Sequence, residues 1–164
     1  MLYVRVWPSP LGRILLASDG QALTGLWFEG QRYFAAGLTS SPVEVPLPVF
    51  EQAERWLAIY FSGRQPQFTP ALRLGKTPYQ RAVYDCLLRI PWGQTATYDL
   101  IAREVAARLD QRPCARAAGG AISRNPISII VPCHRALPKG GGLGGYAGGA
   151  DRKKALLALE GVSL

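Results

Sequence analysis

The sequence contains few of the residues that form covalent or metal cross-links. Its 164 residues include three widely separated cysteines, Cys86, Cys114 and Cys133, and a single histidine, His134. An odd number of cysteines without a Cys-x-x-Cys pair does not indicate a disulfide framework. A structural zinc ion takes about four Cys or His ligands, which this chain could supply only by using Cys133. We therefore expect no metal site and no cofactor.

Long apolar runs are also missing. No segment approaches the ~18 consecutive apolar residues of a membrane-spanning helix, and the first ten residues lack the apolar core of a secretory signal. Hydrophobic residues make up 48% of the chain and charged residues 18%, as in ordinary globular proteins. We expect a soluble intracellular protein without membrane contact, located in the cytoplasm, or in the nucleus if the cell is eukaryotic.

Acidic residues are scarce in the second half of the chain. Residues 71–164 hold 14 of the 19 Lys and Arg residues but only 6 of the 11 acidic residues, so the whole net charge of +8 lies there. Positive charge confined to one half indicates a phosphate-bearing partner such as nucleic acid. An Arg-rich surface that serves only solubility would look the same, so charge alone does not decide between the two.

The first half of the chain has the pattern of a small α+β domain. Apolar runs bounded by turn signals predict strands over 3–7, 13–18 and 21–28. Apolar residues at helical spacing predict a helix over 47–61. The stretch 63–76, rich in proline and polar residues, is the expected linker between a domain at 1–70 and a second domain at 77–164.

The second half has the pattern of a mostly helical domain. Thr77 followed by Pro78 is a typical helix start, and Gln80 can complete a capping box. The other predicted elements are helices from Thr97 and over 114–123 and 151–160, a buried strand over 127–131 and a glycine-rich loop over 140–149. The two helices within 97–123 predict a helix-turn-helix.

The second helix of this motif has almost no side chains. Residues 115–121 read Ala-Arg-Ala-Ala-Gly-Gly-Ala, in which Arg116 is the one long side chain. Each interior glycine costs a helix about 1 kcal/mol relative to alanine, so an adjacent pair needs a reason. That reason is the close approach of another surface, either a ligand or a neighbouring helix of the same fold.

The segment Pro132-Cys133-His134-Arg135 contains the residues suited to nucleophilic chemistry. A free thiol is mostly protonated at neutral pH, but His134 can accept its proton, directly or through water, and Arg135 lowers the cost of the anion. The alternative is a buried cysteine beside a surface histidine. Asn125 precedes the segment at a turn, and Glu160 ends the last helix, where the helix dipole disfavours an acid unless His134 or Arg135 pairs with it.

This segment, together with residues 125–131, resembles the active-site segment of the O6-alkylguanine-DNA alkyltransferase family. Residues 115–121 resemble that family's recognition helix, 145–149 its pocket loop and 160–161 the end of its last helix. These segments follow in the family's order across residues 77–161. The first half of the chain matches loosely, and by analogy it would be a ribonuclease-H-like α+β domain.

The resemblance implies a role for each matching residue. Cys133 would be the nucleophile and alkyl acceptor, His134 would take its proton through a bound water, and Glu160 would orient and polarise His134. Asn125 would hold the active-site turn by hydrogen bonds. The implied DNA and substrate contacts are Arg116 in place of the extruded guanine, Tyr98 against the adjacent phosphate, Tyr146 on the guanine ring, the Ala147 amide at O6, the Ala136 carbonyl at the exocyclic amine, and Tyr79 and Lys139 at phosphates.

These roles describe a suicide DNA-repair protein, a methylated-DNA–protein-cysteine methyltransferase that acts as a monomer on double-stranded DNA through the minor groove. The damaged base is flipped out of the stack, and a long arginine fills the gap it leaves. Cys133 then takes the alkyl group from O6-alkylguanine, and each molecule reacts once because nothing in the chain would hydrolyse the thioether. Whether O4-alkylthymine is a second substrate is left open.

The chain departs from the family in three places. The stretch from Tyr98 to Arg116 is longer than usual by about one helical turn, Ala147 has no hydroxyl, and the zinc ligands that some relatives carry near the N-terminus are absent.

Three other functions would use some of the same residues: a module that binds damaged DNA without repairing it, a cysteine hydrolase or thiol redox enzyme, and a helix-turn-helix regulator. Cys133 argues against the first, and Arg116 and the basic half argue against the second. The lack of base-reading side chains in 115–121 argues against the third.

Overall fold

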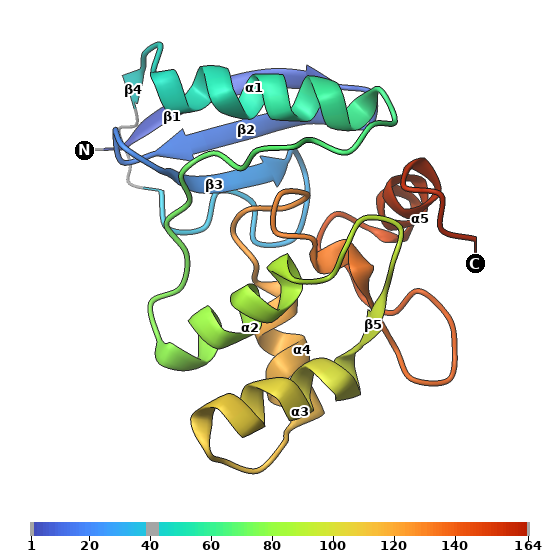
Figure 1. Ribbon diagram of the computed structural model, residues 1–164. Helices are drawn as coiled ribbons and strands as arrows, with labels where there is room; N and C mark the ends of the chain where they lie inside the picture. Colours follow the sequence, from blue (N-terminus) through green and yellow to red (C-terminus); the bar gives the residue numbers. More distant parts are fainter. Residues whose placement is uncertain (1, 39–42, 164) are drawn as a thin grey trace. The chain divides into compact units, whose positions relative to one another are not determined.

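The computed structural model describes residues 2–38 and 43–163, which divide into two compact units (Figure 1). Unit 1 runs to Arg73 and includes Pro126–Ser128, and unit 2 comprises Leu74–Asn125 and the chain from Ile129 onward. Unit 1 contains a sheet and a helix, and unit 2 is mostly helical. The predicted α+β class is confirmed.

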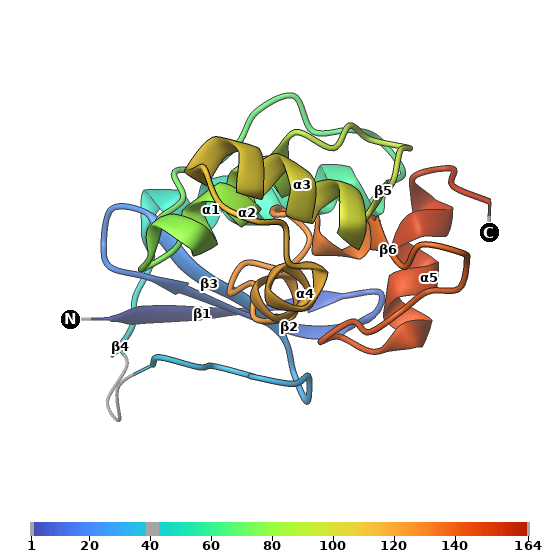
Figure 2. The same cartoon turned by 90° about the horizontal axis from the view of Figure 1, so that it is seen from below.

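Unit 1 is a four-stranded sheet in the order β3-β2-β1-β4 with one helix against it (Figures 1 and 2). Its elements are β1 (Tyr3–Ser9), β2 (Gly12–Ser18), β3 (Leu23–Phe28), β4 (Val43–Glu44) and α1 (Pro48–Phe61). The first three strands pair antiparallel, and β4 pairs parallel with β1. The predicted strands and helix are therefore present with slightly shifted ends, while β4 was not predicted.

Local hydrogen bonds and apolar spacing explain these elements. The Asp19 carboxylate accepts the backbone N–H groups of Gln21 and Ala22, which closes the turn between β2 and β3. Phe50, Leu57 and other apolar residues spaced along one stripe of α1 are fully buried, as are the inward-facing residues of β2 and β3. This shared apolar layer is the core of unit 1.

Unit 2 packs short helices around the segment that carries Cys133. Its elements are α2 (Pro78–Leu88), β5 (Ala96–Thr97), α3 (Tyr98–Leu109), α4 (Ala115–Ser123), the 3-10 helix η1 (Cys133–Arg135), β6 (Ala136–Leu137) and α5 (Ala150–Leu159). The helices α2, α3 and α4 contact one another, as Figures 1 and 2 show. β5 and β6 form a small parallel pair that joins the start of α3 to the end of η1.

The predicted helix-turn-helix is confirmed, and its extra length lies in the turn. The Thr97 hydroxyl caps α3 by accepting the Leu100 N–H, and Cys114 is the N-cap of α4. α3 ends at Leu109 because Asp110 adopts a left-handed conformation, with φ 52° and ψ 56°. Residues 110–114 therefore form a longer connection rather than a longer helix.

The predicted buried strand over 127–131 is wrong. Only Ile127 pairs, in a single parallel bridge with Leu26, whose N–H and C=O bond to Pro126 and Ser128. The chain then turns through Ile129, which has φ 70°. The Val131 carbonyl is bound by the Asn125 side chain, so this segment forms a closed turn instead of a ladder. Apolar β-branched residues are buried here as they would be in a strand, and the sequence pattern does not separate the two cases.

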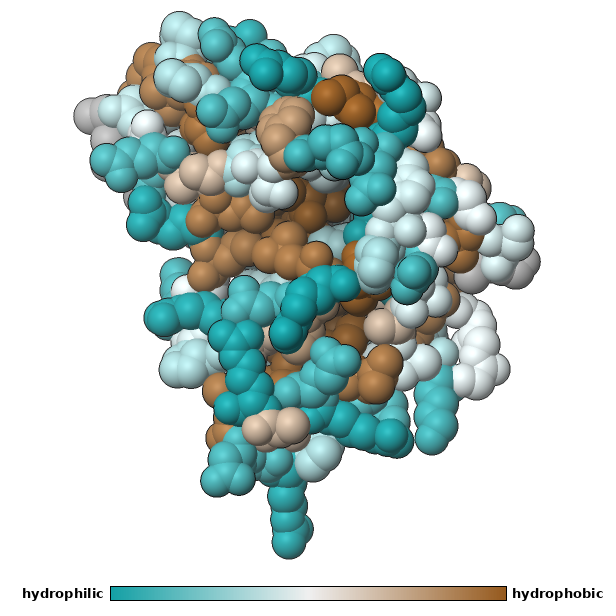
Figure 3. Space-filling model, viewed as in Figure 1, coloured by the Kyte–Doolittle hydropathy of each residue, from teal (hydrophilic) through white to brown (hydrophobic). Residues whose placement is uncertain are grey.

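Hydrophilic side chains cover the face of α2 and α3 that Figure 3 shows, with single apolar residues between them. Leu88 and Leu100 are the exposed large apolar residues of these two helices. The longest helix in the described part of the chain has 14 residues, and none of the described helices could cross a membrane.

The capping box at the start of α2 gives a test of the local folding rules. The Thr77 hydroxyl accepts the Gln80 N–H at 3.1 Å, and the Gln80 side chain accepts the N–H groups of Lys76 and Thr77. We predict that Thr77→Ala lowers the free energy of unfolding by about 1 kcal/mol, measured by urea denaturation. Thr77→Ser keeps the acceptor and should unfold like the wild type. Equal stability of the alanine and serine variants would contradict this account.

Candidate active site

A tight turn places the Cys133 thiol at the start of η1. Pro132 has φ −81° and ψ 63°, and across it the Cys133 N–H donates to the Val131 carbonyl at 2.8 Å. The Arg135 N–H donates to the Pro132 carbonyl at 3.0 Å, which completes the 3-10 turn. Cys133 is 5% exposed, so the thiol is buried in the fold rather than presented on a surface.

The Asn125 side chain closes the loop that leads into this turn. Its amide Nδ2 donates to the Val131 carbonyl at 2.8 Å, and the residue is buried. The Asn125 side chain also lowers the pKa of the Cys133 thiol by hydrogen bonding, although burial acts more strongly in the opposite direction. Asn125 therefore fixes the backbone around Cys133 and stabilises its anion.

His134, Arg135 and Glu160 form a buried hydrogen-bonded group. His134 Nε2 lies 2.6 Å from Glu160 Oε2, and Arg135 Nε donates to Glu160 Oε1 at 2.7 Å. Arg135 also donates from Nη1 to the Ile90 carbonyl at 2.6 Å, just after α2. Because a carboxylate only accepts, the neutral imidazole carries its hydrogen on Nε2, and Nδ1 is its proton acceptor.

Burial controls the protonation of this group. Burial lowers the pKa of His134, and this effect outweighs the Glu160 carboxylate, which raises it. The imidazole is therefore neutral at neutral pH and able to take a proton. Burial also raises the pKa of Cys133, opposed by Asn125, by the Lys153 charge and by backbone N–H groups. The site therefore holds a protonated thiol and a neutral base, the state from which a proton transfer can begin.

Lys153 is a residue of this site that the sequence analysis missed. It lies on α5 with no exposed surface, and its Nζ donates to the Ala136 carbonyl at 2.7 Å and to the Tyr98 hydroxyl at 3.4 Å. Lys153 lies near the start of α5 between two other charged residues, Arg152 and Lys154. Such a run of charges is typical of a helix surface exposed to solvent. The distant segments that pack on α5, which include β6 and the start of α3, decide that this lysine is buried.

The remaining predicted pocket residues lie on three segments of unit 2. Tyr98 opens α3, and its hydroxyl donates to the Gly145 carbonyl at 3.2 Å, which ties this helix to the glycine-rich loop. Tyr146 is buried in that loop and Ala147 is half-buried beside it. Ala136 is buried in β6 directly after η1. The structure therefore joins Tyr98 to the pocket loop instead of leaving its hydroxyl toward solvent.

The predicted DNA contacts lie on the surface of unit 2. Arg116 is exposed in the first turn of α4, Tyr79 is half-buried at the start of α2, and Lys139 is exposed in the loop after β6. None of these three makes a hydrogen bond or ion pair that ties it to the protein in the described residues 2–38 and 43–163. They are available to an outside partner and are separate from the buried group around Cys133.

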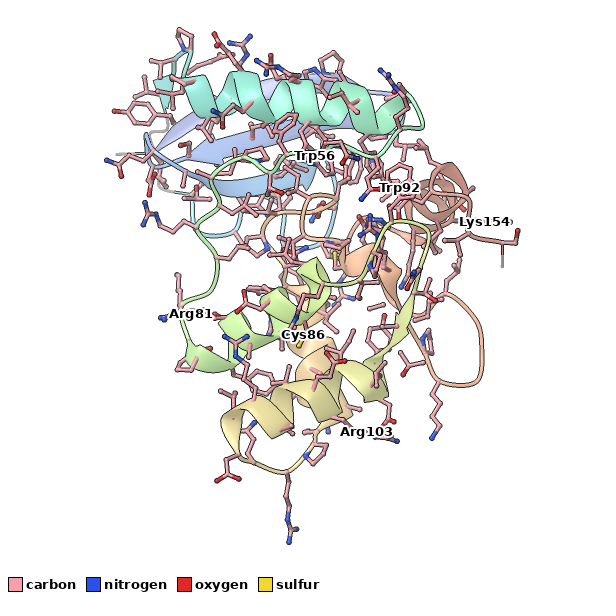
Figure 4. The ribbon with its side chains drawn as sticks, in the orientation of Figure 1. Trp56, Arg81, Cys86, Trp92, Arg103 and Lys154 are labelled. Atoms are coloured by element: carbon pink, nitrogen blue, oxygen red, sulfur yellow. The ribbon has the colours of Figure 1, made fainter. Side chains whose placement is uncertain are left out.

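The other two thiols lie in different surroundings. Cys86 is buried on α2 (Figure 4), where it lines a surface pocket of about 250 Å³ and accepts a hydrogen bond from Arg89 at 3.6 Å. Cys114 is exposed at the start of α4. In the described part of the chain, no group of three or more Cys, His, Asp and Glu side chains could hold a metal ion. Cys133 is the thiol adjacent in sequence to the histidine.

Comparison with known proteins agrees with this geometry. Residues 78–162 match the family described as 6-O-methylguanine DNA methyltransferase, DNA binding domain, and residues 2–74 match the ribonuclease-like domain of the same enzymes. The chain belongs to the 6-O-methylguanine DNA methyltransferase family. The expected family and the ribonuclease-like character of the first half are thereby confirmed.

Individual members of the family are similar over nearly the whole chain. The methylated-DNA–protein-cysteine methyltransferase of Mycobacterium leprae is 41% identical over 160 residues, covering 98% of this chain and 93% of the relative. That of Haemophilus influenzae is 39% identical, covering 97% of this chain and 86% of the relative. The crystal structure of Mycobacterium tuberculosis OGT in complex with DNA matches with a TM-score of 0.84 at 39% identity, covering 96% of this chain and 92% of that one.

The structure removes one explanation for the two glycines of α4 in this methyltransferase. A Cβ added at Gly119 or Gly120 would meet nothing within 4 Å outside the helix's own backbone. Tight packing against a neighbouring helix therefore does not account for them in the described structure. Close approach of an outside surface is the explanation that is left from the sequence analysis.

We predict that Gly120→Ala stabilises the fold and weakens DNA binding. Removing an interior glycine should raise the free energy of unfolding by about 1 kcal/mol, while the added methyl group holds a duplex away from α4. Urea denaturation and fluorescence anisotropy with a labelled duplex measure the two effects. The control Ala107→Gly, at an exposed position of α3, should lose similar stability and bind DNA normally. Unchanged DNA affinity of Gly120→Ala would remove the argument for close approach.

Proposed function

We propose that this protein repairs O6-alkylguanine in double-stranded DNA by transferring the alkyl group to its own Cys133. The observation that carries the proposal is a buried thiol followed in sequence by a neutral imidazole that bonds to Glu160, which in turn accepts from Arg135, within a chain of the methyltransferase family. Because the substrate is DNA, we expect the protein to act in the cytoplasm, or in the nucleus of a eukaryotic cell.

In the proposed reaction His134 acts as the general base. Its Nδ1 takes the Cys133 proton through a water molecule, and Glu160 stabilises the imidazolium that forms. The thiolate sulfur attacks the alkyl carbon, so an S–C bond forms while the C–O6 bond breaks. The electron pair passes to guanine, which takes up a proton as it leaves. The product is a thioether that water does not hydrolyse, so each molecule reacts once.

The pocket around the thiol is proposed to recognise the flipped base. Tyr146 would contact the guanine ring, the Ala147 N–H would face O6 and the Ala136 carbonyl would accept from the exocyclic amine. These residues lie in β6 and in the glycine-rich loop, both between η1 and α5 in unit 2. Donation to the departing guanine lowers the barrier of the transfer step.

The surface of α4 is proposed to approach the minor groove. Its glycines and alanines leave the backbone open to a duplex, and Arg116 is its exposed long side chain. Arg116 would occupy the gap left by the extruded nucleotide, while Tyr98, Tyr79 and Lys139 would contact phosphates. The net positive charge of residues 71–164 favours this partner.

We predict that one molecule of protein removes one methyl group and that the methyl group is found on Cys133 alone. Incubation with a duplex containing O6-methylguanine, followed by peptide mass spectrometry, measures both. Cys133→Ser should abolish transfer and keep the affinity for the duplex within about twofold, because no phosphate contact is removed. Cys114→Ser is the matched control and should react fully. Repeated turnover, or methyl groups on Cys86 or Cys114, would contradict the proposal.

We predict that Arg116→Ala slows repair of duplex DNA by about 30-fold, because the cost of unstacking a base is no longer offset. Its reaction with free O6-benzylguanine should be nearly normal, since the free base needs no flipping. Single-turnover rates with both substrates give the ratio. Arg112→Ala removes the same charge from the exposed loop before α4 and should show a much smaller ratio. Equal losses on both substrates would place Arg116 in the pocket or in folding.

A further inference from the structure

Lys153 is a fully buried cation in contact with the segments that build the site. Its Nζ donates to the Ala136 carbonyl at 2.7 Å, three residues after Cys133, and to the Tyr98 hydroxyl at 3.4 Å. The Tyr98 hydroxyl in turn donates to the Gly145 carbonyl at 3.2 Å. One ammonium group therefore touches both the strand that follows the nucleophile and, through Tyr98, the pocket loop.

This ammonium group has no carboxylate partner in the described part of the chain. The buried carboxylate of the site, Glu160, is bound by His134 and Arg135, and no Asp or Glu side chain among residues 2–38 and 43–163 forms an ion pair with Lys153. A charge without solvent access is costly unless an opposite charge or several hydrogen bonds compensate it. The Ala136 carbonyl and the Tyr98 hydroxyl offset part of the cost of burying the ammonium charge. A nearby anion would offset the rest.

The groups of η1 and α3 that face Lys153 identify that anion. They are Cys133 and His134 on η1, whose proton affinities respond to its charge, and Tyr98 on α3. The imidazole cannot become an anion at ordinary pH, and burial raises the pKa of the Tyr98 phenol above its usual value. Cys133 is the group that can carry a negative charge.

We propose that the Lys153 ammonium is the counter-charge that stabilises the Cys133 thiolate, and that the same group holds the Ala136 carbonyl in position for the guanine while its bond to the Tyr98 hydroxyl fixes the start of α3. Lys153 acts through these groups and is a positioning residue. The positioning role of Lys153 rests on the proposed function, because it assumes that the pocket binds guanine. The counter-charge role concerns the Cys133 thiol alone.

The protonation of Lys153 agrees with this arrangement. Burial lowers its pKa to about 8, and the nearby Cys133 acts in the opposite direction. The Lys153 charge lowers the pKa of Cys133 and of His134 alike, so it favours the thiolate and keeps the base neutral. Below about pH 8 the ammonium is present and supports ionisation of the thiol. Without it, the thiol must ionise at higher pH.

The test compares the reactivity of Cys133 in Lys153→Met and in the wild type. Iodoacetamide reacts with thiolates, and the peptide bearing Cys133 reports its alkylation rate from about pH 6 to about pH 11, a range that extends well above ordinary thiol pKa values. We expect the midpoint to rise by at least about one pH unit in Lys153→Met, with about tenfold slower alkylation at neutral pH. Lys153→Arg keeps the charge and should restore part of the rate.

A neighbouring lysine provides the matched control. Lys154 follows Lys153 on α5 but is exposed (Figure 4), so Lys154→Met removes the same charge without emptying the site. Its pH profile should equal that of the wild type. Identical profiles for Lys153→Met and the wild type would overturn the proposal, as would equal shifts in both methionine variants.

A second measurement needs no substitution and applies even if Lys153→Met fails to fold. The pKa of Lys153 is followed by NMR of its ammonium group before and after complete alkylation of Cys133 with iodoacetamide. A thioether cannot become an anion, so the pKa of Lys153 should fall on alkylation. An unchanged pKa would show that the two groups do not interact.

These readouts separate the inference from the proposed function. Both use iodoacetamide and involve neither DNA nor guanine. A protein in which the thiol responds to Lys153 but does not accept a methyl group from O6-methylguanine would refute the repair function and keep the inference. Normal repair by a Lys153→Met variant with an unshifted profile would do the reverse.

Discussion

The buried carboxylate of Glu160 is the interaction on which the site depends. It lies at the C-terminal end of α5, where the helix dipole disfavours an acid, and it is nevertheless 4% exposed. Two donors from η1, the His134 imidazole and the Arg135 guanidinium, compensate it, and Arg135 extends the link to the Ile90 carbonyl after α2. Three segments far apart in the sequence are thereby joined at one carboxylate, and removing either donor would leave a buried charge incompletely paired.

The balance of charge in unit 2 follows from this arrangement. Arg135 and Lys153 bring two positive charges into the site, and Glu160 brings one negative charge. Ionisation of Cys133 makes the sum zero, so these charges offset part of the cost of forming the thiolate, although burial still raises the pKa of the thiol. The same charges disfavour a protonated His134, which leaves the base ready to receive the proton. A thiol that is inert by burial alone is thus suited to one reaction with a substrate that fits.

Local interactions explain the parts of the fold that were predicted correctly. The caps of α2 and α3 use Thr77 and Thr97 with N–H groups three residues ahead, and the turn between β2 and β3 uses Asp19 and its own neighbours. Such contacts are written within a few residues of sequence, so they can be recognised without the fold. The order of the family's segments around Cys133 predicted the family in the same way. The linker over 63–76 and the roles of the site residues stay predictions.

The sequence by itself determined the helices with the caps of α2 and α3, the three main strands and the family, and it singled out Cys133 as the candidate nucleophile. Only the tertiary structure decided that residues 127–131 turn instead of forming a strand, because the Val131 carbonyl is bound by Asn125 and Ile129 takes a positive φ. It also decided that Lys153 is buried and Lys154 exposed, although both belong to one charged helix turn. The physical reason is that burial depends on which distant segments cover a residue, and no pattern along the helix specifies that the strand after Cys133 and the start of α3 lie against Lys153.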